Sequence, residues 1–160
     1  MSIKKIIFGG LFCASFTAIS ALAAVKEGDK FGDWTASCQK DACVVGQLVN
    51  INGQPAGRMM IQKSKDDKAP YIAFITLRLD LGVNLMQGLG LGIDGKEVGR
   101  APFEFCHEEG CNVFLPLDDK ILGKLKSGNK LQLQFFTGGP DKRITVDFSL
   151  SGITKAVEAL

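Results

Sequence analysis

The chain has 160 residues, of which 46% are hydrophobic and 22% are charged, and its formal net charge at pH 7 is +2. This length suits one domain together with a targeting segment, and the composition is too apolar for a disordered chain and too charged for a protein with several membrane spans. A net charge this small also argues against a basic nucleic-acid-binding domain, so we expect no nucleic acid partner.

Residues 1–23 have the pattern of a secretory signal peptide. Lys4 and Lys5 precede an uncharged, mostly apolar run, and the small residues Ala21 and Ala23 predict cleavage after Ala23. An uncleaved anchor helix is the alternative, because the run is about long enough to span a bilayer. We therefore expect an exported protein that is periplasmic, or else outer-membrane-associated or secreted.

Removal of this segment changes the charge and the cysteine count. It takes two of the 19 basic residues and none of the 17 acidic ones, so the mature chain is neutral. It also takes Cys13, one of the 5 cysteines, and leaves an even number. An even number of cysteines in an exported chain predicts a disulfide framework.

Residues 24–160 are expected to form a single domain of short strands, because apolar residues alternate with polar ones along most of it. The Asn52-Gly53 and Asp94-Gly95 pairs predict tight hairpin turns, and the polar residues 63–68 predict a loop. The alternation from 75 to 93 is too long for one strand, so a bend is expected at Gly82 or at Gln87-Gly88. The predicted strands are 31–37, 44–51, 57–62, 75–93, 96–99, 103–106, 111–115, 131–135 and 144–150.

Two short helices are expected in the last third of the chain. Asp118 or Asp119 can cap a helix that ends at Gly128, although Gly123 inside it is unfavourable for a helix. Residues 151–160 can form a terminal helix. The predicted fold class is therefore mainly β: an antiparallel β-sandwich or a partly open barrel with one or two short helices, including a C-terminal one.

The four remaining cysteines form two pairs with the same spacing, Cys38 with Cys43 and Cys106 with Cys111. If each loop is a hairpin tip, the two cysteines of a pair face each other at a separation that a disulfide can bridge. Four cysteines allow three connectivities, and we favour Cys38–Cys43 with Cys106–Cys111 because each pair is local.

Two other uses of these cysteines must be weighed. They could form a four-thiolate zinc site with His107 as a further ligand, but export into an oxidising compartment argues against it. A redox-active dithiol has two intervening residues rather than four. The glycines from Gly90 to Gly95 match the letters of a dinucleotide-binding loop, but a hairpin and not a helix is expected to follow them. We therefore expect no metal and no cofactor.

Four short motifs, taken in order, resemble the invasion-associated locus B family. They are Phe31-Gly32-Asp33-Trp34, Pro102-Phe103-x-x-Cys106 followed by Gly110-Cys111, Leu122-x-x-Leu125-Lys126-x-Gly128, and Ser149-Leu150-x-Gly152. The resemblance covers residues 31–160, and Ile153 departs from it where a phenylalanine is expected. It implies a small exported bacterial β-protein with two disulfides and no established catalytic residues. Founding members are associated with host-cell invasion and have an outer-membrane or secreted location.

The sequence thus favours a non-enzymatic envelope or secreted protein that is associated with invasion or virulence and acts by binding, with no catalytic residues. The expected partner is an envelope or host protein, and peripheral outer-membrane association and homo-oligomerisation are further expectations. One alternative is an envelope hydrolase that uses the carboxylates of Asp33, Glu104 or Glu108. Another is a structural homodimeric envelope scaffold with an exposed sheet edge. A further binding candidate is the basic cluster of Lys120, Lys124, Lys126 and Lys130.

Overall fold

A computed structural model of the chain describes residues 25–40, 42–51, 53–78, 83–137 and 142–160. The predicted signal peptide lies outside these residues. The elements, in chain order, are β1 (Lys30–Phe31), β2 (Trp34–Gln39), β3 (Ala42–Ile51), β4 (Gln54–Asp66), β5 (Ala69–Leu77), the 3-10 turn η1 (Leu85–Gln87), β6 (Leu89–Ile93), β7 (Lys96–Ala101), β8 (Phe105–His107), β9 (Gly110–Leu117), α1 (Asp119–Ser127), β10 (Lys130–Phe136), β11 (Arg143–Ser149) and α2 (Ile153–Ala159).

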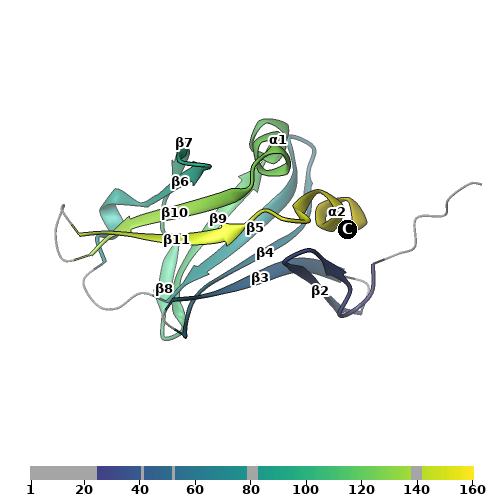
Figure 1. Ribbon diagram of the computed structural model, residues 1–160, viewed down its shortest axis with the longest axis horizontal. Helices are drawn as coiled ribbons and strands as arrows, with labels where there is room; N and C mark the ends of the chain where they lie inside the picture. Colours follow the sequence, from purple (N-terminus) through teal and green to yellow (C-terminus); the bar gives the residue numbers. More distant parts are fainter. Residues whose placement is uncertain (1–24, 41, 52, 79–82, 138–141) are drawn as a thin grey trace, which may run out of the picture.

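The strands form two antiparallel sheets that pack face to face, which confirms the predicted β-sandwich. One sheet has seven strands in the order β1-β2-β3-β4-β5-β9-β8, and the other has four in the order β11-β10-β6-β7. Figure 1 shows the smaller sheet lying across the larger one, with both helices to one side. No helix in the described part of the chain is long and apolar enough to cross a membrane.

One hydrophobic core fills the space between the sheets. Its members come from the inward-facing positions of both sheets, among them Trp34, Ile61, Ile75, Leu133 and Phe148, all of which are fully or almost fully buried. The two helices close the core: α2 packs on β1 and β2, and α1 packs on β9 and α2. Asp118 caps α1 by accepting the N–H of Ile121 at 2.7 Å, and Gly128 follows its last turn, as the sequence predicts.

The long alternating run is divided, as expected, and its two halves lie in different sheets. β5 ends at Leu77 in the larger sheet and β6 begins at Leu89 in the smaller one. Gly88, at the second predicted bend, has a φ of +63°, whereas Gly82 lies outside the described residues. Asp94 and Gly95 have φ values of +49° and +80°, the left-handed values that a tight hairpin turn requires.

The predicted strand limits are wrong most clearly in two places. The predicted loop at residues 63–68 is mostly strand, because β4 continues to Asp66 and its backbone pairs with β5 even where its side chains reach solvent. The predicted strand 31–37 is broken at Gly32, which has a φ of +61°. A Cβ there would lie 2.5 Å from the carbonyl oxygen of Ser151, so the break allows the chain to approach the C-terminal segment closely.

Candidate functional site

The two cysteine pairs form disulfides within separate hairpins. The strand register places Cys38 opposite Cys43 on β2 and β3, and Cys106 opposite Cys111 on β8 and β9. Both pairs are bonded, with Cα–Cα distances of 4.1 Å and 4.0 Å. The first hairpin lies where β3 begins and the second beside the end of β5, toward opposite edges of the seven-stranded sheet. The four sulfurs therefore do not meet at one site, and the described residues contain no cluster of three or more metal-binding side chains.

The structure places the carboxylates of the hydrolase alternative toward two opposite edges of the larger sheet. Asp33 lies in the turn between β1 and β2, near one edge of the larger sheet, whereas Glu104 and Glu108 flank β8 at the other edge. His107 accepts the backbone N–H of Glu109 at its Nδ1 atom, 3.2 Å away, and so takes part in the turn of its own hairpin. These positions count against paired-acid catalysis by the three residues.

The first and last family-like motifs form one clasp, defined by residues 31–34 and 149–152. The Trp34 indole N–H donates to the carbonyl of Ser149 at 3.1 Å, and the N–H of Asp33 donates to the carbonyl of Ser151 at 3.2 Å. A Cβ on Gly152 would lie 2.1 Å from the carbonyl oxygen of Phe31. These motif residues therefore have a structural role, since they join the two ends of the domain.

Two other patterns in the sequence have structural explanations. Gly90 and Gly92 lie within β6, and the Asp94-Gly95 turn leads to the strand β7 and not to a helix. In the basic cluster, Lys126 pairs with Glu158 at 2.9 Å and Lys130 pairs with Asp147 at 3.0 Å. The glycines therefore belong to a hairpin, and two of the four lysines are paired with carboxylates.

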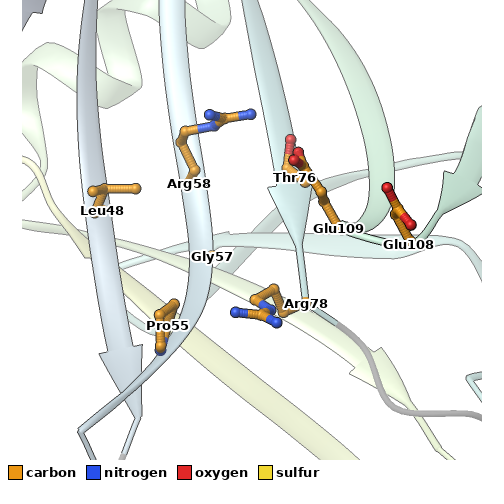
Figure 2. A pocket seen from close by; sticks show the side chains of 8 residues that line it. All are labelled: Leu48, Pro55, Gly57, Arg58, Thr76, Arg78, Glu108 and Glu109. Atoms are coloured by element: carbon orange, nitrogen blue, oxygen red, sulfur yellow. The ribbon is translucent and has the colours of Figure 1, made fainter.

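A pocket of about 370 Å³ opens where the second disulfide hairpin meets the middle of the larger sheet. Two arginines, Arg58 on β4 and Arg78 just after β5, and two glutamates, Glu108 and Glu109 in the β8–β9 turn, contribute its charged side chains. Leu48, Pro55, Gly57 and Thr76 complete the lining. We call this the Arg–Glu pocket, and Figure 2 shows its side chains from close by.

Gly110 brings the acidic turn to the pocket. It has a φ of +142°, and a Cβ at this position would lie 2.2 Å from the carbonyl oxygen of Leu77 and 3.2 Å from the N–H nitrogen of Arg78. The β8–β9 turn therefore presses directly on the end of β5, which only glycine permits. The Cys106–Cys111 disulfide closes the same hairpin one residue further on and restricts its freedom.

The charged groups of the pocket have no ionic partners among the described residues. The ion pairs in the described residues lie outside the pocket and join Arg100 with Glu97, Lys126 with Glu158 and Lys130 with Asp147. Figure 2 shows Arg58 reaching from β4 toward Thr76 on β5, while Glu109 extends toward Thr76 from the other side. The pocket therefore places cationic and anionic groups on facing sides without joining them.

Beside the pocket, the outward face of the larger sheet carries apolar side chains. Met60 on β4 lies opposite Phe74 on β5, which lies opposite Phe114 on β9. The Phe74 and Phe114 rings meet edge to face at 5.1 Å, and Phe105 on β8 extends the contact at 5.9 Å. All four are partly exposed or exposed, so they form an apolar row, defined as Met60, Phe74, Phe114 and Phe105, on a face that usually carries polar side chains.

A polar pair, Thr76 on β5 and Asn112 on β9, lies in the cross-strand row next to that of Met60, Phe74 and Phe114. The Thr76 hydroxyl donates to the Asn112 side-chain oxygen at 2.8 Å. Asn112 is only 8% exposed, and its Nδ2 atom has no acceptor in the described part of the chain. The hydrogen bond of this pair joins β5 to β9 beside the pocket, which Thr76 lines.

Sequence reasoning missed both the pocket and the apolar row. On β4, Met59 is fully buried while its neighbour Met60 is partly exposed, so the residue type alone does not tell the core position from the outward one. A signal was present in residues 71–77, which are apolar at nearly every position. Such a strand is usually covered on both faces, yet only one face of β5 is covered by the described residues.

Taken together, the geometry defines an antiparallel β-sandwich with a disulfide in each of two hairpins. Residues 34–160 match the model of the family described as Invasion associated locus B (IalB) protein. The chain therefore belongs to the invasion-associated locus B family.

Related proteins agree with this assignment. Invasion protein B homologs of Brucella abortus, from strain 2308 and from biovar 1 strain 9-941, are each 26% identical over 159 residues, which cover 91% of this chain and 91% of theirs. The crystal structure of invasion associated protein b from Bartonella henselae superposes with a TM-score of 0.69 at 20% identity, covering 80% of this chain and 91% of that one. The latter similarity shows the shared fold.

Proposed function

We propose that the protein is exported and acts at the cell envelope or outside the cell as a non-enzymatic binding protein, with an envelope or host protein as its partner. The observation that carries this proposal is the outward face of the larger sheet, where the apolar row lies beside the Arg–Glu pocket. Exposed apolar surface rimmed by charged groups is typical of protein interaction sites.

The hairpin that carries the Cys106–Cys111 disulfide also supports a binding function. It supplies Phe105 to the apolar row and Glu108 and Glu109 to the pocket, so one short hairpin contributes to both parts of the surface. A hairpin fixed by a disulfide and by the close approach of Gly110 to Leu77 loses little conformational entropy when a partner binds. Membership of an invasion-associated family makes a partner on a host cell or in the bacterial envelope a natural expectation.

The binding surface can be tested in the source bacterium. A strain that lacks the gene is complemented with the wild-type chain, with Phe74→Ser, or with Thr145→Ser, a mild change at an exposed residue of β11 in the smaller sheet. We expect the deletion and Phe74→Ser to impair host-cell invasion or envelope integrity, and Thr145→Ser to restore them. Unchanged invasion and unchanged envelope integrity in the deletion strain would contradict the proposal, provided that the wild-type protein is expressed.

Export is tested separately by cell fractionation and non-reducing peptide mapping. We expect the mature chain to begin at Ala24, to lie outside the cytoplasm, and to contain Cys38–Cys43 and Cys106–Cys111 peptides. A cytoplasmic chain that retains residues 1–23, or free thiols on all four cysteines, would be incompatible with the proposed location.

A further inference from the structure

The Arg–Glu pocket has a charge pattern that restricts its ligand. Arg58 and Arg78 attract an anion, but Glu108 and Glu109 line the same pocket and repel it. A simple cation is attracted by the two glutamates but repelled by the two arginines. A ligand that carries both signs, spaced so that each meets its opposite, satisfies both sets of groups at once.

The shape and the apolar lining add to this restriction. The pocket volume of about 370 Å³ lies at the small end of the range for ligand sites, about 300–1,000 Å³, and so suits a small molecule or a short chain. Leu48, which is 72% exposed, and Pro55 provide apolar surface at the side of the pocket opposite the glutamates (Figure 2). An apolar side chain placed there would cover Leu48 from water.

We propose that the Arg–Glu pocket binds a short peptide with free ends, whose carboxylate pairs with Arg58 and Arg78 and whose amino group pairs with Glu108 and Glu109. An apolar side chain of the peptide lies over Leu48 and Pro55. The planar guanidinium group of arginine matches a carboxylate with two parallel hydrogen bonds, which suits Arg58 and Arg78 to a chain end. This inference rests on the proposed binding function of the same face, and it names the chemical class of the ligand that the pocket binds.

The structure explains why the four charged groups stay available for such a ligand. Arg58 extends from the middle of a long strand, and the Gly110 contact holds the acidic turn against β5. Neither arginine forms an ion pair with either glutamate within 4.0 Å in the described residues, so a ligand can enter between them. Since the groups are exposed, the affinity is expected to be modest, with each lost charge pair weakening binding by about fivefold.

The test is a titration of the purified disulfide-bonded protein with four forms of the peptide Ala-Leu-Ala, followed by NMR chemical shifts. The forms have both ends free, the amino end acetylated, the carboxyl end amidated, or both ends blocked. We expect the free peptide to bind most tightly, each single block to weaken binding by about fivefold, and the doubly blocked peptide to bind weakest. Equal affinity for all four forms, or no shift with any of them, would overturn the proposal.

Variants assign each end of the peptide to its side of the pocket. In Arg58→Gln/Arg78→Gln, amidation of the peptide should no longer weaken binding, whereas acetylation should still weaken it. Glu108→Gln/Glu109→Gln should show the reverse. In Arg143→Gln and Glu97→Gln, which change exposed charges on β11 and β7, both modifications should still weaken binding as in the wild type. If both modifications still weaken binding to the pocket variants, the peptide binds elsewhere and the assignment is overturned.

The outcome also separates this inference from the proposed function. If the acetylated peptide binds as tightly as the free one, the pocket is an anion site and the peptide proposal is wrong. If no form binds, yet the Phe74→Ser strain still fails in invasion or envelope integrity, the peptide proposal is wrong and the binding function of the outer face stands. If the peptide binds as expected but deletion of the gene changes neither property, the proposed function fails and the pocket chemistry stands.

Discussion

The side chain of Gln47 makes the two hydrogen bonds that a neighbouring strand would make with the backbone of Ser149. Its Oε1 atom accepts the Ser149 N–H at 2.8 Å, and its Nε2 atom donates to the Ser149 carbonyl at 3.2 Å. The Nε2 atom also donates to the carbonyl of Asp33 at 3.2 Å. Gln47 is 9% exposed, so this amide joins β3 of one sheet to the end of β11 of the other in a nearly dry environment.

Gln47→Leu should therefore lower the free energy of unfolding. The substitution keeps the side-chain size but leaves the backbone groups of Ser149 without these partners, and an unpaired buried polar group costs about 1–3 kcal/mol. Urea unfolding monitored by circular dichroism measures the loss. Gln39→Leu, at an exposed position of β2, is the matched control and should change stability little. Equal stability of the two variants would show that the Gln47 amide does not join the sheets.

Gly152→Ala should be strongly destabilising. Gly152 has a φ of +85°, and the added Cβ would lie 2.1 Å from the carbonyl oxygen of Phe31 and 2.8 Å from the Gly32 nitrogen, so the clasp would have to open. Gly99→Ala, where a Cβ meets nothing within 4 Å, is the control and should remain folded. Thermal unfolding compares the two. A midpoint for Gly152→Ala within a degree of the wild type would exclude this role of the clasp.

Gly123→Ala should stabilise the protein. Gly123 is exposed inside α1, and a Cβ there meets nothing within 4 Å. Glycine inside a helix is less favourable than alanine by about 0.5–1 kcal/mol, because it loses more backbone entropy on folding. Chemical unfolding should show an increase of this size, and a decrease would mean that this part of α1 is not helical.

Asp94→Asn should reduce stability at neutral pH and have no effect in acid. Hydrogen bonds from the backbone N–H of Asn129, and then from Lys130 and the Asn129 side chain, hold the pKa of Asp94 below its usual value of 3.8. Because the folded-state pKa is the lower one, the carboxylate stabilises the fold above pH 3.8, and this contribution is lost as the pH falls through the folded-state value.

The measurement is the difference in unfolding free energy between wild type and Asp94→Asn across the acidic range. Asparagine tolerates the positive φ of 49° at this turn, so the backbone should remain unchanged. Asp67→Asn, in the exposed β4–β5 turn, serves as the matched control for an aspartate-to-asparagine change. A difference that does not shrink as the pH falls below 3.8 would assign the effect of Asp94→Asn to the turn rather than to the charge.

Removal of the second disulfide by Cys106→Ser/Cys111→Ser should weaken both stability and peptide binding. The bond closes a loop of sequence separation 5, for which the loop-entropy relation gives about 2 kcal/mol. The first disulfide has the same separation, so Cys38→Ser/Cys43→Ser should cost a similar amount. Only the Cys106–Cys111 hairpin reaches the Arg–Glu pocket, so only its removal should weaken binding of Ala-Leu-Ala. Equal weakening by both double variants would mean that global stability, and not the local hairpin, governs binding.

Much of the fold could be predicted because its signals are local. The alternation of Leu131, Leu133 and Phe135, the cap at Asp118 and the Asp94-Gly95 turn each depend on a few neighbouring residues, and all appear where they were expected. The C-x4-C spacing likewise indicates which cysteines can face each other across a hairpin.

The rest depends on contacts between distant residues. Nothing near Gln47 indicates that its amide binds Ser149, 102 positions away, or that Gly32 must be glycine because Ser151 lies against it. The pocket combines β3, β4, β5 and the β8–β9 turn, and Gly110 brings Glu108 and Glu109 there by its contact with Leu77. Alternation assigns residues to the two faces of a strand, but it does not reveal which outward face is left apolar.

The clasp between residues 31–34 and 149–152 also sets the order in which the domain can be completed. During synthesis, Trp34 and Gln47 emerge about a hundred residues before Ser149, so their side-chain polar groups have no partner until β11 has been made. Closure of the clasp then also requires Gly152, which lies against Phe31. A chain made only as far as β10 thus lacks the hydrogen bonds of the clasp, and we expect the two ends of the domain to join in the last step of folding.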